Sequence, residues 1–144
     1  MPTLIHRRVE AARCGKHPSF VARLPSGWAV LGDKQVLKGY CLLLPDPVVP
    51  HLNALSGADR LQFLGDMAKL GDAILRVTGA VRINYEMLGN LEPALHAHVV
   101  PRHFNEPAEL ATRPFWFYDW DQAQDFDPKS DAALIESLRQ ELAR

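Results

Sequence analysis

The sequence predicts an α+β fold in which an antiparallel sheet carries one long packed helix and a further helix at the C-terminus. Residues 81–85 and 95–99 alternate apolar and polar side chains, as half-buried strands do. Residues 56–78 repeat apolar side chains at helical spacing and end before Gly79, a common helix stop. The length, 144 residues, suits one domain.

Two earlier apolar stretches complete the predicted sheet. Residues 28–31 and 39–44 are typical of neighbouring strands, and the polar residues 32–34 form a turn between them. Three prolines within residues 45–50 remove backbone donors, so we expect a rigid loop there.

The helices are expected to lie on one face of this sheet. Ser56 can cap the long helix, and Ser130 can cap the final one. The stripe expected to face the sheet consists of Leu61, Leu64, Met67, Ala68, Gly71, Ile74 and Leu75. The final helix carries Leu134, Ile135, Leu138 and Leu142.

Composition excludes several function classes. With 16 Lys and Arg against 17 Asp and Glu, the net charge is -1, so we expect neither nucleic acid nor a membrane surface as a partner. No apolar run approaches the roughly 20 residues of a membrane span. The N-terminal residues lack the apolar core of a secretory signal, so we expect a cytoplasmic protein. Cys14 and Cys41 are not expected to form a disulfide.

Two histidines carry the chemical signal. Residues two apart on a strand share a face, so His96 and His98 should present adjacent imidazoles while Ala97 points into the core. The pair is compatible with a structural role, an anion site or a metal site. A zinc or iron site needs three or four protein ligands, and no nearby acidic or cysteine cluster supplies the others.

The segment around this pair resembles a known family. Residues 84–102, NYEMLGNLEPALHAHVVPR, resemble the strand-loop-strand signature of the histidine triad superfamily, H-x-H-x-H-x-x, often followed by Pro-Arg. Residues 32–45, GDKQVLKGYCLLLP, are similar to the family's acidic turn, glycine and apolar strand. The resemblance covers about residues 25–105 and implies the histidine triad-like fold, in a bacterial branch similar to diadenosine polyphosphate hydrolases.

The resemblance also suggests how the chain is organised. We expect one domain over residues 1–144, with an N-terminal extension at 1–24, the family core at 25–105 and an aromatic tail with the C-terminal helix at 106–144. Within the tail, the aromatic residues 115–120 are typical of a packing element rather than a base-stacking wall.

Catalytic roles follow by position in the motif. The second histidine of the family's triad is the nucleophile and the third contacts phosphate, which implies these roles for His96 and His98. Ala94 occupies the first position. We expect a histidine restored at Ala94 to keep or raise the rate.

Substrate contacts follow in the same way. Asn84, Gly89 and Asn90 match positions that hydrogen-bond phosphate oxygens in the family, and Asp33 resembles its ribose-binding residue.

The implied function is a nucleotide hydrolase or nucleotidyl transferase. A neutral imidazole can attack the α-phosphorus of a nucleoside phosphate, such as a dinucleoside polyphosphate or a phosphoramidate, and form a nucleotidyl-histidine. This scheme needs neither a metal nor another cofactor. The family also implies a homodimer. Two alternatives stay open: a nucleotide-binding module with little turnover because of Ala94, and a metal-dependent enzyme with His96 and His98 as ligands.

Overall fold

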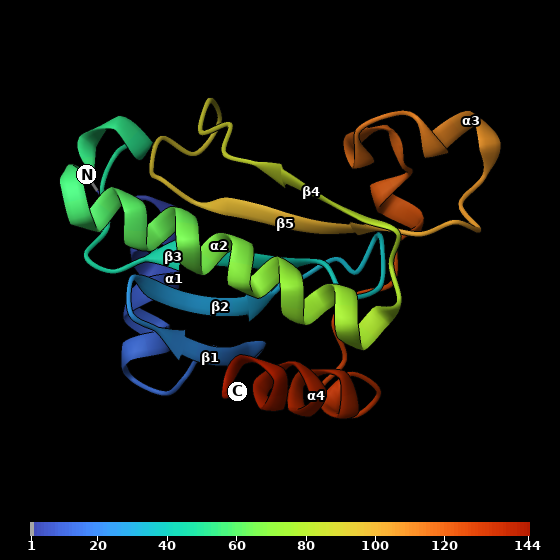
Figure 1. Cartoon of the computed structure of the whole chain (residues 1–144), viewed down its shortest axis with the longest axis horizontal. Coiled ribbons are helices and arrows are strands. Elements are labelled where there is room, and N and C mark those ends of the chain that lie inside the picture. The colour runs from blue at the N-terminus through green and yellow to red at the C-terminus, as the bar shows by residue number, and fades with distance from the viewer. Residues whose placement is uncertain (1) are drawn as a thin grey trace.

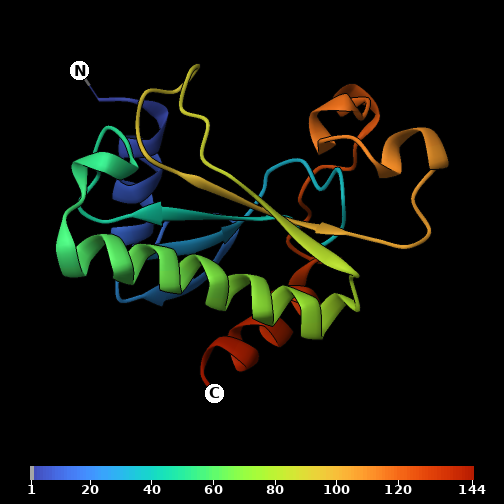
Figure 2. The ribbon, with the colours of Figure 1, turned by 45° about the horizontal axis from the view of Figure 1, so that its top comes forward.

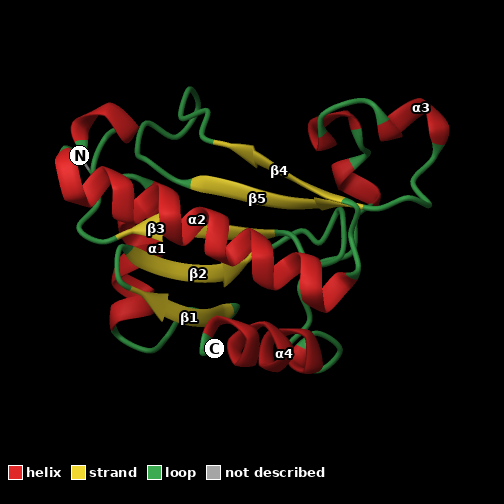
Figure 3. Ribbon diagram, in the orientation of Figure 1, coloured by secondary structure: helices red, strands yellow, loops and turns green. Residues whose placement is uncertain are grey.

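The computed structural model of the chain describes residues 2–144 as a sheet with helices on both faces (Figure 1; Figure 3). Its helices are α1 (Leu4–Arg13), α2 (Gly57–Thr78), α3 (Ala108–Ala111) and α4 (Ala132–Leu142). Its strands are β1 (Phe20–Leu24), β2 (Gly27–Leu31), β3 (Cys41–Pro45), β4 (Arg82–Glu86) and β5 (Ala97–Arg102). Short 3-10 helices cover Leu52–Ala54, Phe115–Phe117 and Trp120–Gln122.

The sheet is antiparallel, as the sequence predicts, with the strand order β1-β2-β3-β5-β4. β5 is therefore interior, between β3 and β4. His98 on β5 lies opposite Leu42 on β3 and Glu86 on β4. This register fixes His98 on the sheet face that carries the even-numbered residues of β5.

Helices cover both faces of the sheet. α2 and α4 cover the face of Ala97 and Val99 and enclose the main core. α1 lies on the opposite face, together with the segment from residue 103 to residue 122 (Figure 2). The two predicted helices share one face, as expected, whereas α1 on the other face was not predicted.

Residues 2–24 supply one strand of the sheet and one helix that packs on it. The segment expected as an extension over residues 1–24 holds α1 and β1 within its described part. Thr3 caps α1 by accepting from the backbone N–H groups of Ile5 and His6. Ile5, Val9 and Ala12 bury one stripe of this helix.

The long helix matches its predicted span, but its buried stripe differs from the prediction. Gly79 ends α2 with a φ of 72°, the left-handed conformation that glycine tolerates best. The described side chains that α2 buries are Phe63, Asp66, Leu70, Gly71, Ala73 and Ile74. Leu61 is 71% exposed. The stripe is thus rotated relative to the expected one and centres on Leu70, with only Gly71 and Ile74 common to both.

One polar group and one glycine explain why this face of α2 fits the sheet. The buried Asp66 carboxylate accepts the backbone N–H of Ser26 at 2.8 Å. A Cβ at Gly71 would lie 2.1 Å from the hydroxyl of Tyr85 on β4, so only glycine allows this approach.

The remaining boundaries differ by a few residues. β3 begins at Cys41 and β5 at Ala97, each two residues later than predicted. Asp131, rather than Ser130, is the N-cap of α4. Its buried carboxylate accepts the N–H of Asp127 at 2.9 Å and pairs with Lys38, which holds it at this position.

The described residues also bear on the compartment predictions. Cys14 is exposed, Cys41 is buried, and both are free cysteines. Within residues 2–144, no helix combines the length and hydropathy of a membrane span.

Candidate active site

A cavity of about 460 Å³ lies on the α1 side of the sheet. His96 and His98 lie in its wall, and so do Asp33 and residues 88–92 of the loop that precedes β5. α1 contributes to one side of the cavity and the aromatic segment around Trp116 contributes to the other. The cavity therefore collects most of the residues that the sequence motif singled out.

His96 lies one residue before β5 and is oriented by the backbone. Its Nδ1 lies 2.7 Å from the carbonyl oxygen of Ala94. Because a carbonyl only accepts, Nδ1 must carry a proton, so in the neutral imidazole the unprotonated nitrogen is Nε2. The backbone itself is held here, since the N–H of Leu95 donates to the carbonyl of Val49 at 2.8 Å.

His98 lies beside His96, with 4.9 Å between the ring centroids. Its Nδ1 is 2.7 Å from the hydroxyl of Tyr40, which is itself buried. Burial, with a smaller effect of the neighbouring His96, lowers the pKa of His98 to about 4. His98 is thus a neutral imidazole at physiological pH.

The loop before β5 brings backbone and amide groups to the cavity. Gly89 adopts a φ of 68°, which a side chain would strain, and both Gly89 and Asn90 line the cavity. Leu91 is 94% exposed, so this loop buries little apolar surface. Because Gly89 and Asn90 line the same cavity as the two histidines, the loop can place polar groups near both imidazoles.

Asp33 reaches the cavity from the turn after β2. Its carboxylate pairs with the guanidinium of Arg8 on α1, and both side chains line the cavity. Arg8 holds the pKa of Asp33 below its ordinary value. Asp33 is therefore an ionised acceptor at neutral pH.

The aromatic segment forms a wall against His98. The indoles of Trp116 and Trp120 stack with 5.0 Å between centroids and 10° between planes, and both line the cavity. The ring of Trp116 meets His98 edge-on, again with 5.0 Å between centroids. Trp116 is 39% exposed, so this segment both packs on the site and presents an open aromatic face.

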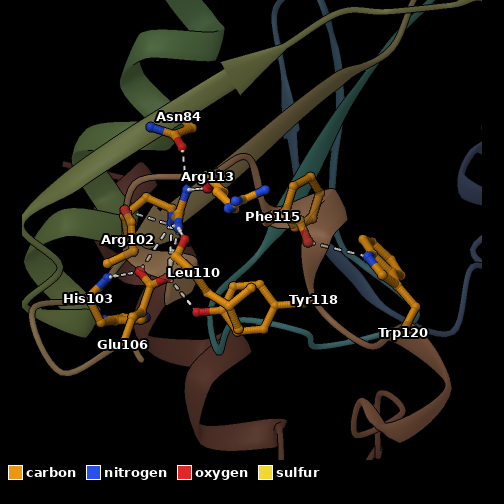
Figure 4. A network of polar contacts seen from close by, with 10 residues as sticks. Asn84, Arg102, His103, Glu106, Leu110, Arg113, Phe115, Tyr118 and Trp120 are labelled. Carbon is orange, nitrogen blue, oxygen red and sulfur yellow. Dashed lines mark hydrogen bonds and ion pairs between the residues drawn. The ribbon is translucent and has the colours of Figure 1, made fainter. Parts of the chain in front are cut away.

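A buried ion pair fixes the chain that carries this wall (Figure 4). Arg102, at the end of β5, pairs with Glu106 at 2.8 Å and donates to the carbonyls of Leu110 and Arg113 at 3.0 and 2.6 Å. The hydroxyl of Tyr118 also donates to Glu106. Burial, together with the Glu106 carboxylate, raises the pKa of Tyr118 to about 12. Arg102 thus links the end of β5 to Glu106, which precedes α3, and to Arg113, which follows it.

Asn84 belongs to this network. Its amide oxygen accepts from Arg102 at 2.9 Å (Figure 4), and Asn84 is not among the residues that line the cavity. The structure therefore does not bring Asn84 together with Gly89 and Asn90. β4 places it opposite Val100, nearer the far end of β5 than the two histidines.

The first position of the triad is closed to a larger side chain. Ala94 is 1% exposed and packs with Ile5 and Val9 of α1 and with Leu44 of β3. A histidine there would overpack this cluster, so it should lower the stability of the fold; its effect on the rate stays a prediction. Only the backbone carbonyl of Ala94 serves the site.

Arg8 and the other α1 residues of the cavity, Leu4 and Ile5, were not predicted from the sequence. A helix there could have been predicted from Thr3 as an N-cap followed by Ile5 and Val9 at helical spacing. The contact of Tyr40 with His98 joins positions 58 residues apart, and no local pattern predicts it.

Comparison with known proteins bears on the fold. No protein-family profile and no curated protein sequence matches this chain. A histidine triad protein from Bradyrhizobium japonicum is similar in structure, with a TM-score of 0.75 and 22% identity over 91% of this chain and 95% of the other. One from Marinobacter aquaeolei gives a TM-score of 0.77 and 18% identity over 98% and 96%. The chain has the histidine triad fold.

A third protein is also similar in structure. It is a hypothetical histidine triad nucleotide-binding protein from Sulfolobus tokodaii, with a TM-score of 0.71 and 13% identity over 95% of this chain and 91% of that one. The predicted fold class is thereby confirmed. At these identities the likeness establishes the histidine triad fold, and the chemistry rests on the cavity residues.

Proposed function

We propose that the chain is a nucleotide hydrolase or nucleotidyl transferase in which Nε2 of His96 attacks the α-phosphorus of a nucleoside phosphate. The hydrogen bond between Nδ1 of His96 and the carbonyl of Ala94 carries this proposal. It directs the unprotonated nitrogen away from the backbone, as a nucleophile requires. The substrate would be a dinucleoside polyphosphate or a nucleoside phosphoramidate.

The reaction has two steps. In the first, the bond from Nε2 to phosphorus forms and the bond from phosphorus to the leaving group breaks. In the second, water attacks the same phosphorus and His96 departs, which releases a nucleoside monophosphate; an acceptor other than water gives transfer. His98, Asn90 and the N–H of Gly89 would meet the charge that develops on the phosphoryl oxygens.

The cavity offers separate surroundings for the other parts of a nucleotide. Asp33 would accept from the ribose hydroxyls. The partly exposed Leu4 of α1 and Leu42 of the sheet would contact the base, backed by the buried Ile5, Val30 and Leu44. The volume of about 460 Å³ falls within the usual range of small-molecule sites.

The test compares two variants and a control. With a nucleotide labelled at the α-phosphate, His96→Gln should give no turnover and no labelled protein, while nucleotide binding survives. His98→Gln should retain labelling but lose about a hundred- to thousandfold in rate, as expected for one lost donor. His51→Gln, which removes an exposed histidine outside the cavity, should behave as wild type. Wild-type turnover by His96→Gln would refute the proposal.

A binding module with little turnover is the first rival, and Ala94 motivates it. The hydrogen bond to the Ala94 carbonyl argues against this rival, because the backbone orients His96 without a first imidazole. Stoichiometric binding of nucleotide by wild type, without release of nucleoside monophosphate, would favour the binding module.

A metal-dependent enzyme is the second rival. Among residues 2–144, no group of three or more His, Cys, Asp or Glu side chains is arranged to hold a metal ion. We therefore expect chelators to leave the activity unchanged. Complete loss with a chelator and recovery with zinc alone would favour the metal-dependent reaction.

We also propose a homodimer acting in the cytoplasm. β4 is an edge strand, and Tyr85 on it and Val81 beside it are 40% and 62% exposed. Covering such an edge by a second copy is favourable. Sedimentation as a monomer at micromolar concentration would count against the dimer, and fractionation of cells tests the location.

A further inference from the structure

Tyr40 is held tightly against His98 at the entry to β3. It is 4% exposed, and its ring lies 5.0 Å from that of Phe115 and 6.3 Å from that of Trp120, both edge-on. On the remaining side the chain is Gly32, where a Cβ would lie 2.3 Å from the ring. The phenol is therefore fixed with its hydroxyl 2.7 Å from Nδ1 of His98.

The surroundings decide which of the two groups donates. Burial raises the pKa of Tyr40 well above its ordinary value, so the phenol keeps its proton. Within residues 2–144, its hydroxyl has hydrogen-bond contact with His98 alone. If Nδ1 of His98 donated, the phenol proton would be buried without an acceptor, which disfavours that arrangement by roughly ten- to hundredfold. If Tyr40 donates, both groups are satisfied.

We propose that Tyr40 is a positioning residue that donates to Nδ1 of His98 and thereby fixes the proton of His98 on Nε2. His96 has the opposite arrangement, since the Ala94 carbonyl requires its proton on Nδ1. The two neighbouring imidazoles are thus set in opposite tautomers. One presents a lone pair to the cavity and the other presents an N–H donor.

The opposite tautomers give the two adjacent histidines different roles toward one phosphoryl group. A second free lone pair beside the phosphoryl group would repel its oxygens, whereas an N–H stabilises the charge that forms on them. This interpretation rests on the proposed function for its catalytic consequence. The tautomers themselves do not depend on it and are measured without substrate.

The first experiment is nitrogen NMR of the wild-type chain labelled in its histidines, with the His98 signals assigned by their absence from His98→Gln. We expect a protonated Nε2 and an unprotonated Nδ1 for His98. Tyr40→Phe should shift His98 toward a mixture of tautomers. Tyr85→Phe removes a hydroxyl from a tyrosine outside the cavity, so it should leave the His98 signals unchanged.

The second experiment is kinetic. Tyr40→Phe should lower kcat by roughly ten- to hundredfold with little change in KM, because the misplaced proton matters most when charge builds on the phosphoryl oxygens. Tyr85→Phe should retain wild-type values.

The outcomes separate the two proposals. A protonated Nδ1 on His98 in the wild type overturns the role of Tyr40, whatever the activity and whether or not Tyr40→Phe folds. Unchanged His98 signals and kcat in Tyr40→Phe overturn it as well. The predicted tautomers together with wild-type turnover by His96→Gln would overturn the proposed function alone.

Discussion

Protonation of His98 should weaken the fold over a defined pH range. Its pKa is about 4 in the folded chain, mainly because it is buried, whereas an unfolded histidine titrates near 6.5. Between these values the unfolded chain binds more protons, so stability increases with pH. The contribution of His98 is therefore fully present above about pH 6.5 and is lost as the pH falls toward 4.

The size of this effect follows from the two pKa values. A tenfold difference in proton affinity is worth about 1.4 kcal/mol, so the complete loss amounts to about 3 kcal/mol, of which about 2 kcal/mol falls between about pH 7.5 and about pH 5. The groups that face His98 are His96, the hydroxyl of Tyr40 and Glu86, its cross-strand neighbour.

The assay is urea unfolding at the two pH values. Wild type should lose about 2 kcal/mol more than His98→Gln, since glutamine stays neutral at both. His17→Gln removes a second histidine whose pKa is lowered by burial, and it should give a separate, partial reduction. His51→Gln controls for the loss of an exposed histidine. If His98→Gln showed the same pH dependence as wild type, the buried neutral state of His98 would be incorrect.

Four further substitutions, one of them combined with Glu106→Gln, test the packing by urea unfolding. Arg102→Leu leaves the Glu106 carboxylate buried and unpaired, so it should cost about 3–5 kcal/mol, and adding Glu106→Gln should recover part of this. Ala94→His should destabilise by about 1–3 kcal/mol through overpacking under α1; unchanged stability would mean that α1 moves away easily. Gly65→Ala in α2 should stabilise by about 0.5–1 kcal/mol, because a Cβ there meets nothing within 4 Å. Gly71→Ala should lack this gain, since its Cβ meets the Tyr85 hydroxyl; equal effects would contradict the close contact.

The parts of the fold that were predictable depend on local periodicity. Alternation placed β4 and β5, and it put His96 and His98 on one face because two-residue spacing fixes the side in any strand. Helical spacing and Gly79 gave the span of α2. The buried stripe of α2 was harder to predict, because contacts with residues distant in the sequence decide which face of the helix packs on the sheet. One such contact is the hydrogen bond from the backbone N–H of Ser26 to Asp66.

The site was predictable only where the motif is local. Gly89 and Asn90 precede His96 in one loop, and the structure brings them to the same cavity. Asn84 lies on β4 and not in that loop, and its phosphate-binding role was assigned only from the resemblance to the family. The buried Arg102 guanidinium needs acceptors, and Asn84 supplies one of them. This contact depends on how β4 pairs with β5, and the sequence pattern does not specify that register.

The position of α1 has a consequence for redesign. Leu4 and Arg8 form part of the cavity from a helix that precedes the first strand. Under the proposed function, residues that contact the nucleotide and the residue that attacks it are therefore encoded in separate stretches of the gene. Libraries that vary α1 could exchange the nucleoside moiety while the segment that bears His96 stays constant. Ile5 and Val9 would have to be kept, because they pack on Ala94, whose carbonyl accepts from Nδ1 of His96.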